Sequence, residues 1–439
     1  MKRFGLVAVA LLAAACVSTG VSAPAARHLV LISLDGLRPE FYLDPSFEAP
    51  TRRALVAEGS HARAVEGVFP SVTYPSHTSI VTGVRPARHG ILFNLLFDPS
   101  GQRTRWYEET ADLETTTLWM WARAAGLTTA SVSWPVTFGA GIDSLLAERD
   151  YYVRPQPVAD LLAASTPGLF DRVGVTPDPA TFKDVERWDT FLVTVASGVI
   201  RTARPNLLLL HLVQADARQH QSGRDGAEVK TAVARLDAHV ATVRQAIMAA
   251  GIADHTTIIV TGDHGFQNVG EYVYPNHVLT RAGLRNCPRA SGSRATVHGS
   301  GGAAAVFVDP PDDAALIART ETALRAGAEG RYTVLTRAEL DALGAMNGAA
   351  LGLEAAPGWA IGTSCDRGLT ESSRTGRGTH GFLPSRPSMA TGFIAAGAGV
   401  RAGVVLARAR LIDIAPTAAR LLGIPAPPVE GRVLEEILR

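Results

Sequence analysis

Residues His28–Leu34 read HLVLISL, an unbroken apolar run that ends directly in Asp35-Gly36. Two later runs have the same form: Asn206–Val213 (NLLLLHLV), which leads towards Asp216, and Thr256–Thr261 (TTIIVT), which ends in Gly-Asp-His-Gly. Apolar runs of this length without polar alternation are typical of strands buried on both faces. They predict the inner strands of a parallel sheet.

Helix-like segments separate the apolar runs, at Thr117–Ala125, Lys183–Ile200, Ala227–Ala250, Asp312–Ala326 and Ile412–Leu422. Further strands are expected at Ala303–Val308 and Gly392–Ala396. Strands that alternate with helices predict an α/β fold, with a mostly parallel central sheet covered by helices on both faces. Two stretches, about 138–180 and 267–378, fit the alternation poorly. We expect them to be insertions over the strand ends that form a small cap on a single domain, residues 27–439.

The composition excludes several classes of protein. Of the 439 residues, 46% are apolar and 19% are charged, which excludes a disordered or collagen-like chain. The 42 basic and 41 acidic residues give a net charge of +1, which disfavours bulk nucleic acid as a partner. Lysine occurs only at positions 2, 183 and 230, so a catalytic or phosphate-binding lysine is nearly excluded.

The N-terminus, residues 1–23, has the pattern of an export signal. Lys2 and Arg3 precede an apolar run that ends at Cys16, and small residues lead to a cleavage position after Ala23. Lipidation at Cys16 is the alternative, although the preceding residues form a poor lipobox. Export to the periplasm or the medium implies an oxidising compartment, where Cys287 and Cys365 could form one disulfide. No later segment has the length and apolarity of a membrane span.

Carboxylates and imidazoles follow the strand ends, where open α/β sheets place their sites. These residue types together suit zinc and related divalent metals. Each fragment alone is weak evidence for a site. A lone aspartate after a strand is often a helix cap, and a DxxxH pair often lies on a solvated helix face. Their order and placement together indicate a site. The candidates are Asp35, Thr73 in FPSVTYPSHTSIVTG, Asp216 and His220 in DARQH, Asp263 and His264 in TGDHG, and His380 in GTHGF.

These motifs, in this order, resemble the nucleotide pyrophosphatase/phosphodiesterase family of the alkaline phosphatase superfamily. The resemblance runs from Asp35 to His380 and includes DIAPTAARLLGIPAP at 413–427. It implies an alkaline-phosphatase-like fold and a site for two zinc ions. One ion would be held by Asp216, His220 and His380, and the other by Asp35, Thr73, Asp263 and His264. His77 and His89 lie in matching motifs but are expected to be structural.

The resemblance also implies a mechanism in which Thr73 attacks phosphorus and forms a phospho-threonine intermediate. Zinc lowers the pKa of a threonine hydroxyl, which is otherwise a poor nucleophile. Thr73 precedes an apparent helix at Ser76–Val81, whose N-terminus would offer free N–H groups to the phosphate. Asn94, together with the backbone N–H of Tyr74, would hold the charge that develops on the phosphate oxygens.

The expected substrate is a phosphodiester or nucleotide pyrophosphate. A monoester dianion needs an additional cation and no lysine is at hand, whereas a diester needs apolar contacts for its second substituent. The aromatic candidates for these contacts are Tyr74, Phe93, Tyr151 and Tyr152, although core or surface packing is at least as good an explanation for any one of them. Leu95 could line the same slot.

Several alternatives stay open at this level. A phosphomonoesterase or a phosphonoacetate-type phosphonate hydrolase could use the same metal ligands, although the latter is expected to need lysines. A sulfatase would use a modified cysteine or serine in place of Thr73. A non-catalytic zinc-dependent binding protein would not need Thr73. The sequence does not determine the oligomeric state.

Overall fold

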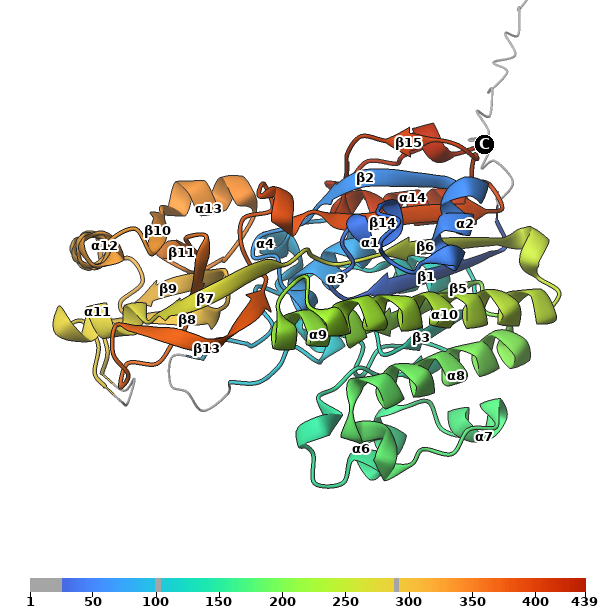
Figure 1. Cartoon of the computed structure of the whole chain (residues 1–439), viewed down its shortest axis with the longest axis horizontal. Coiled ribbons are helices and arrows are strands. Elements are labelled where there is room, and N and C mark those ends of the chain that lie inside the picture. The colour runs from blue at the N-terminus through green and yellow to red at the C-terminus, as the bar shows by residue number, and fades with distance from the viewer. Residues whose placement is uncertain (1–25, 99–103, 288–291) are drawn as a thin grey trace, which may run out of the picture.

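A nine-stranded sheet forms the centre of the molecule (Figure 1). The computed structural model describes residues 26–98, 104–287 and 292–439, so the predicted export segment and Cys16 lie outside the described residues. The strand order is β15-β2-β14-β6-β1-β5-β3-β4, and β16 also pairs with β2. The strands are β1 (His28–Leu34), β2 (Ser60–Glu66), β3 (Thr129–Val132), β4 (Ser144–Leu146), β5 (Leu207–Leu212), β6 (Thr256–Thr261), β14 (Thr391–Gly397), β15 (Val405–Leu406) and β16 (Ala409–Arg410).

The three apolar runs are the adjacent parallel strands β6, β1 and β5, as the sequence predicts. Successive side chains of β1 point to opposite faces. Leu29 and Leu31 join one hydrophobic core, and Val30, Ile32 and Leu34 join another. Both faces of the strand are therefore buried, which explains why its sequence is apolar throughout.

Helices cover both faces of the central sheet, which confirms the predicted fold class. Residues of α2, α8 and α10 contribute to the core on one face, and residues of α3, α5 and α14 to the core on the other. All five predicted helices are present, as α5, α8, α10, α12 and α14. The helices are α1 (Glu40–Leu43), α2 (Pro50–Glu58), α3 (Thr73–Thr82), α4 (Pro86–His89), α5 (Leu118–Ala124), α6 (Pro157–Ala164), α7 (Leu169–Val173), α8 (Val185–Ala203), α9 (Gln214–Ser222), α10 (Ala227–Ala249), α11 (Pro275–Arg281), α12 (Ala314–Ala328), α13 (Arg337–Leu343) and α14 (Ile414–Leu422).

Two predicted strands differ from the parallel pattern. The strand expected at Gly392–Ala396 is β14, which is antiparallel to both of its neighbours, β2 and β6. The strand expected at Ala303–Val308 is β9, which pairs antiparallel with β8 and β11 in a separate sheet. Only Gly301 and Gly302 separate β8 from β9, and a connection that short joins antiparallel neighbours.

Two smaller sheets lie beside the central sheet, at the left of Figure 1. One has the order β12-β7-β13, and the other the order β10-β11-β9-β8. Residues 138–180, expected over the strand ends, instead contribute β4 to the edge of the central sheet, and α7 packs on α8. The strands are β7 (Gln267–Val273), β8 (Ala295–Ser300), β9 (Ala303–Val308), β10 (Tyr332–Leu335), β11 (Leu351–Ala355), β12 (Gly358–Ile361) and β13 (Thr370–Thr379).

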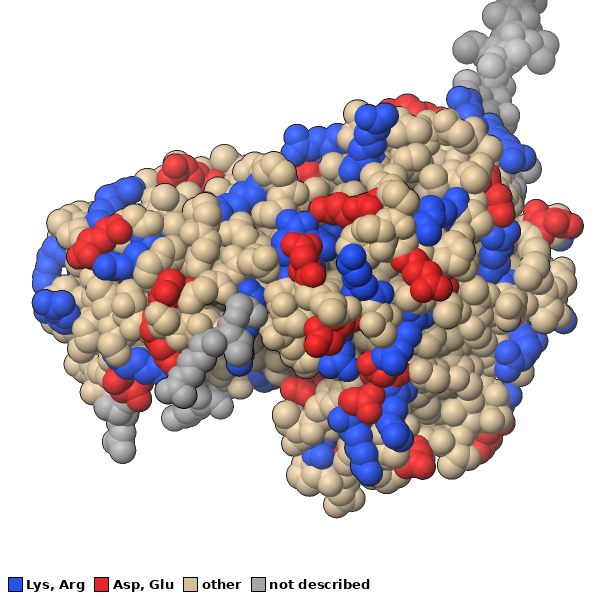
Figure 2. All heavy atoms as spheres, viewed as in Figure 1, with Lys and Arg blue, Asp and Glu red and all other residues tan. Residues whose placement is uncertain are grey.

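Basic and acidic side chains are interspersed over the face of the molecule shown in Figure 2. Charged side chains of the described residues form many ion pairs, for example Arg337 with Asp341 and Arg244 with Glu58. Among the described residues, none of the helices combines the length and the apolarity that crossing a membrane requires.

Candidate active site

The carboxyl ends of three adjacent strands bring most of the predicted ligands together. Asp35 directly follows β1, Asp263 and His264 follow β6, and Asp216 and His220 lie on α9 just beyond β5. Because these strands are parallel, their ends meet at one edge of the sheet. His380 reaches the same edge from the end of β13.

Gly36 allows the chain to turn directly after Asp35. Its φ of +69° lies in the left-handed region, and a Cβ there would lie 2.7 Å from Gln219 Nε2. A side chain at this position would therefore be both strained and crowded. The Gly36 N–H donates to Asp263 Oδ1 at 3.0 Å, which joins the ends of β1 and β6.

The three histidines of the site have the same arrangement. Each Nδ1 lies within hydrogen-bonding distance of a backbone carbonyl: that of Gly378 for His220 (3.0 Å), Ser71 for His380 (3.0 Å) and Gly265 for His264 (3.2 Å). If Nδ1 donates, the lone pair of Nε2 is free. That lone pair faces a carboxylate oxygen in each case, at 3.3 Å and 3.6 Å from Asp216 Oδ1 for His220 and His380, and at 3.1 Å from Asp263 Oδ2 for His264.

Acceptors that face one another across a buried site need a proton or a metal cation between them. Asp35 Oδ1, Asp216 Oδ1, Asp263 Oδ2 and His264 Nε2 are all buried and have no hydrogen-bond partner. The donor set of carboxylates and neutral imidazoles fits zinc, and the backbone contacts of the Nδ1 atoms are those that orient metal-binding histidines. The residues present therefore fit a divalent metal.

The ligand atoms form two overlapping groups, each with its members within 4.8 Å of one another. One group is Asp216, His220 and His380, the same three residues that the resemblance implies for one ion. The other joins Asp35 and His264 to Asp216. Asp263 stands beside this second group, with Oδ2 at 3.1 Å from His264 Nε2. Asp216 thus belongs to both groups.

The pKa shifts of Asp35, Asp263, His264 and His380 are consistent with a site for a divalent metal. Burial, followed by the neighbouring Asp216, raises the pKa of Asp35 well above its usual range. Burial, followed by Asp35, does the same for the pKa of Asp263. Burial lowers the pKa of His264 strongly and that of His380 to about 4, which keeps both rings in the neutral form that binds metals. A divalent cation would offset the cost of ionising these buried carboxyl groups.

His211, on β5, is a site residue that the sequence reasoning did not find. Its Nε2 lies 3.0 Å from Asp35 Oδ2 and its Nδ1 lies 3.1 Å from the Ser133 carbonyl oxygen. It occupies one carboxylate oxygen of Asp35 and leaves Oδ1 facing His264, 3.5 Å from its Nε2. The only signal in the sequence is one histidine within an otherwise aliphatic strand.

Replacing His211 with asparagine is expected to reduce metal affinity or kcat/KM by about 10–100-fold, because Asp35 loses the contact that orients it. Metal affinity is measured by competition with a chelating dye, and the fold is checked by thermal unfolding. His239→Asn, on α10, is the matched control and should change neither quantity. Wild-type metal affinity and activity in His211→Asn would contradict this role.

Thr73 is the first residue of α3, which begins earlier than the predicted Ser76–Val81. His77 Nδ1 lies 2.8 Å from the Thr73 carbonyl oxygen, and His77 Nε2 lies 2.8 Å from Ser33 Oγ, so His77 ties the first turn of α3 to β1. His89 is likewise buried and contacts Ser79 Oγ at 3.0 Å.

The N-terminus of α3 offers fewer free N–H groups than expected. The Tyr74 N–H donates to Asn94 Oδ1 at 3.0 Å, Pro75 has no N–H, and the Ser76 N–H donates to the Val72 carbonyl. Tyr74 N–H and Asn94 are therefore not two independent donors. The backbone contact instead fixes the Asn94 side chain, whose Nδ2 remains as the donor group.

The predicted aromatic contacts need correction. Tyr74, Phe93 and Tyr151 are only 4%, 6% and 1% exposed. Phe93 belongs to a hydrophobic cluster with Ala303 and Ala305, and Tyr151 packs against Trp188 in the main core. Tyr152 is exposed but contacts Trp188 at its ring edge. Tyr151 is therefore a core residue, and Tyr152 lies at the edge of the same aromatic cluster.

Trp106 is an aromatic residue at the surface that lies against the buried Tyr74 ring. The two ring centroids are 5.4 Å apart, and Trp106 is 36% exposed. Its backbone forms an antiparallel bridge with Leu95, which is 37% exposed. The Tyr74 hydroxyl donates to Glu148 Oε2 at 2.5 Å and is thereby held in place. No motif in the sequence marks Trp106 or Glu148, since both reach this position through the fold.

The fold and the site together define an α/β protein of the alkaline-phosphatase type with a candidate metal centre. Human ectonucleotide pyrophosphatase/phosphodiesterase 5 has a similar structure, with a TM-score of 0.71 at 20% identity over 94% of this chain and 100% of that chain. An inactive threonine-to-alanine variant of the murine protein, in complex with AMP, also has a TM-score of 0.71, at 19% identity over the same shares, 94% and 100%.

The family model for type I phosphodiesterase / nucleotide pyrophosphatase matches residues 29–383, and the chain belongs to this family. Ectonucleotide pyrophosphatase/phosphodiesterase family member 7 of Rattus norvegicus is 25% identical over 264 residues, which are 58% of this chain and 54% of that protein. Member 1 of Homo sapiens is 24% identical over 263 residues, covering 57% and 25%. The matches span about half or less of these relatives.

Proposed function

We propose that this protein is an exported, two-zinc phosphodiesterase/nucleotide pyrophosphatase that acts through a phospho-threonine intermediate on Thr73. The observation that carries the metal part is the set of buried, unpartnered ligand atoms on Asp35, Asp216, Asp263 and His264. The family membership supports the reaction class.

In this proposal Asp216, His220 and His380 hold one zinc, and Asp35, Thr73, Asp263 and His264 hold the other. Zinc supplies Lewis-acid chemistry, which lowers the pKa of a hydroxyl and offsets charge on phosphate oxygens. His211 orients Asp35, and His77 holds the first turn of α3, so the backbone of Thr73 is in place before substrate binds.

The proposed reaction forms a bond between Thr73 Oγ1 and phosphorus as the bond from phosphorus to the leaving oxygen breaks. Water then hydrolyses the phospho-threonine and regenerates the hydroxyl. Asn94 Nδ2 is the donor for a phosphate oxygen, and its amide is already oriented by the Tyr74 N–H.

The proposed substrate is a phosphodiester or a nucleotide pyrophosphate that transfers a nucleoside 5′-phosphoryl group. The AMP complex of the murine neighbour supports a nucleotide ligand. Trp106 beside Tyr74 provides an exposed ring face for a nucleobase. Lys230, over the Phe47 ring, and Lys183, at the end of a short turn, belong to other parts of the molecule.

Export is supported by the disulfide between Cys287 and Cys365, since such bonds persist in oxidising compartments. The exported protein would either be cleaved after Ala23 or carry a lipid on Cys16.

The test is a comparison of chromogenic esters on the zinc-loaded protein. We expect kcat/KM for p-nitrophenyl thymidine 5′-phosphate and bis-p-nitrophenyl phosphate to exceed that for p-nitrophenyl phosphate by at least about tenfold, or about 1.4 kcal/mol of transition-state free energy. Removal of zinc with a chelator should abolish all three activities, and zinc should restore them. A preference for the monoester would overturn the diesterase assignment.

A further inference from the structure

A cavity of about 610 Å³ opens beside His220. Its walls include Tyr272 from β7, Tyr274 just after it, the loop that follows β12, and Thr379 at the end of β13. This volume lies in the range of small-molecule sites, which is roughly 300–1,000 Å³. Because His220 belongs both to the cavity and to the candidate metal cluster, an occupant would lie next to that cluster.

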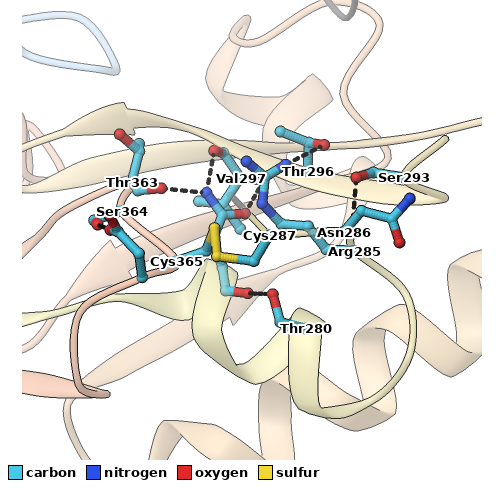
Figure 3. Close-up of a disulfide and its surroundings, with 12 residues drawn as sticks. Thr280, Arg285, Asn286, Cys287, Ser293, Thr296, Val297, Thr363, Ser364 and Cys365 are labelled. Carbon is cyan, nitrogen blue, oxygen red and sulfur yellow. Dashed lines mark hydrogen bonds between the residues drawn. A yellow bond between two sulfur atoms is a disulfide. The ribbon is translucent and has the colours of Figure 1, made fainter. Parts of the chain in front are cut away.

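The loop that forms the outer wall is held from several sides. The disulfide between Cys287 and Cys365 ties it to the segment before β8, as Figure 3 shows. Asn276 Nδ2 donates to the Thr363 carbonyl at 2.7 Å and to the Val297 carbonyl at 3.0 Å. Gly362 lies directly against the Tyr274 ring, and a Cβ at that position would be 2.4 Å from Cε1. The wall is therefore formed before any ligand binds.

The charged groups at the cavity already have partners. Arg367 Nη1 donates to Glu371 Oε2 at 2.7 Å, and the Tyr274 hydroxyl donates to the same oxygen at 2.8 Å. The Ser364 hydroxyl donates to Asp366. The lining therefore has no net positive charge with which to bind a polyphosphate. It offers the Tyr272 ring, hydroxyl groups and backbone groups, which suit an uncharged, hydroxyl-bearing ring compound.

We propose that this cavity binds the leaving group of the substrate, and that the leaving group it accepts is a nucleoside and not pyrophosphate. The inference rests on the proposed function, in which Thr73 Oγ1 displaces the leaving oxygen in line. Thr73 lies beside His77, which contacts Asp263, whereas the cavity borders the group of Asp216, His220 and His380. Thr73 gives up its hydroxyl proton to water as the Oγ1–phosphorus bond forms, the bond from phosphorus to the nucleoside 3′-oxygen breaks, and that oxygen takes a proton from water.

Three substrates that share the thymidine 5′-phosphoryl group test this proposal. Thymidylyl-(3′→5′)-thymidine releases thymidine, thymidine triphosphate releases pyrophosphate, and p-nitrophenyl thymidine 5′-phosphate releases p-nitrophenolate. In Tyr272→Ala we expect kcat/KM for the dinucleotide to fall roughly three- to tenfold, the scale of a lost ring contact, with the other two substrates unchanged. Tyr272→Phe keeps the ring and should retain most of the dinucleotide activity.

The disulfide provides a second, independent variant. Replacing both Cys287 and Cys365 with serine should raise KM for the dinucleotide while leaving p-nitrophenyl thymidine 5′-phosphate unchanged, because only the outer wall is released. Thermal unfolding of each variant confirms that it is folded at the assay temperature.

The outcomes separate this inference from the proposed function. Equal losses on all three substrates, no loss on the dinucleotide, or a selective loss on the triphosphate would each overturn the nucleoside assignment. A wild-type protein that cleaves none of the three contradicts the proposed function instead. In that case, binding of free thymidine to the wild type and to Tyr272→Ala, measured by saturation-transfer NMR, still tests the cavity: equal signals would overturn the inference.

Discussion

Thr73→Ala is expected to lower kcat for p-nitrophenyl thymidine 5′-phosphate by about 10⁴-fold or more, the scale seen when an activated nucleophile is deleted. The hydroxyl sits on the first residue of α3, whose carbonyl oxygen is held by His77. The proposed mechanism uses no other nucleophile on the chain. The variant should still bind zinc, because Asp35, Asp263 and His264 keep their positions without it.

Two further variants sharpen the result for Thr73. Thr73→Ser retains a hydroxyl and should keep measurable turnover, with a phosphorylated protein trapped by acid quenching from a labelled substrate. Thr82→Ala, at the other end of the same helix, removes a hydroxyl that bonds only within and just beyond α3 and should leave kcat near that of the wild type. Turnover close to that of the wild type in Thr73→Ala would contradict the proposed covalent mechanism.

Asp216→Asn is expected to reduce activity by about 10³-fold and to lower the metal content of the purified protein. Its carboxylate belongs to both candidate metal groups, so one substitution weakens both sites. An amide has one acceptor oxygen in place of two and carries no charge, whereas His220 and His380 both face Asp216 Oδ1. Removal of one group that stabilises charge in the transition state typically lowers kcat by about 10²–10³-fold. A loss of that size is therefore expected even if the metal stays bound.

Metal content is measured by mass spectrometry after gel filtration, alongside kcat/KM. His220→Asn is the comparison variant and should lose metal from one group only. Asp341→Asn, an exposed partner of Arg337, is the surface control and should behave as the wild type. Full occupancy of both sites in Asp216→Asn would show that the two groups do not share this ligand.

The inner part of the fold was readable because it depends on local pattern. The apolar runs of β1, β5 and β6 are buried on both faces, and a strand inside a covered parallel sheet is an environment that such runs are typical of. The local sequence does not predict whether β14 runs parallel or antiparallel to its neighbours. A strand of Ala, Ile and Phe has the same composition in either direction, and its orientation depends on where the chain enters the sheet.

At the site, residue type likewise does not show which aromatic side chains are exposed. Tyr151 and Phe93 are as suitable by type for a substrate slot as Trp106, yet the fold buries the first two and leaves Trp106 at the surface. Burial depends on what the rest of the chain packs against a side chain, and the residues that cover Tyr151 come from segments 30 residues or more further along.

By itself the sequence determined the α/β class, the ends of the central strands and the residue types gathered there, because strand pattern and ligand chemistry are both local properties. Only the tertiary structure decided which atoms face one another. It placed Asp216 in both candidate metal groups, put His211 behind Asp35, occupied the Tyr74 N–H with Asn94, and tied the loop beside the His220 cavity to another segment through the Cys287–Cys365 disulfide. Each of these contacts joins residues far apart in the chain or depends on the direction of a side chain, and neither property is contained in a local pattern.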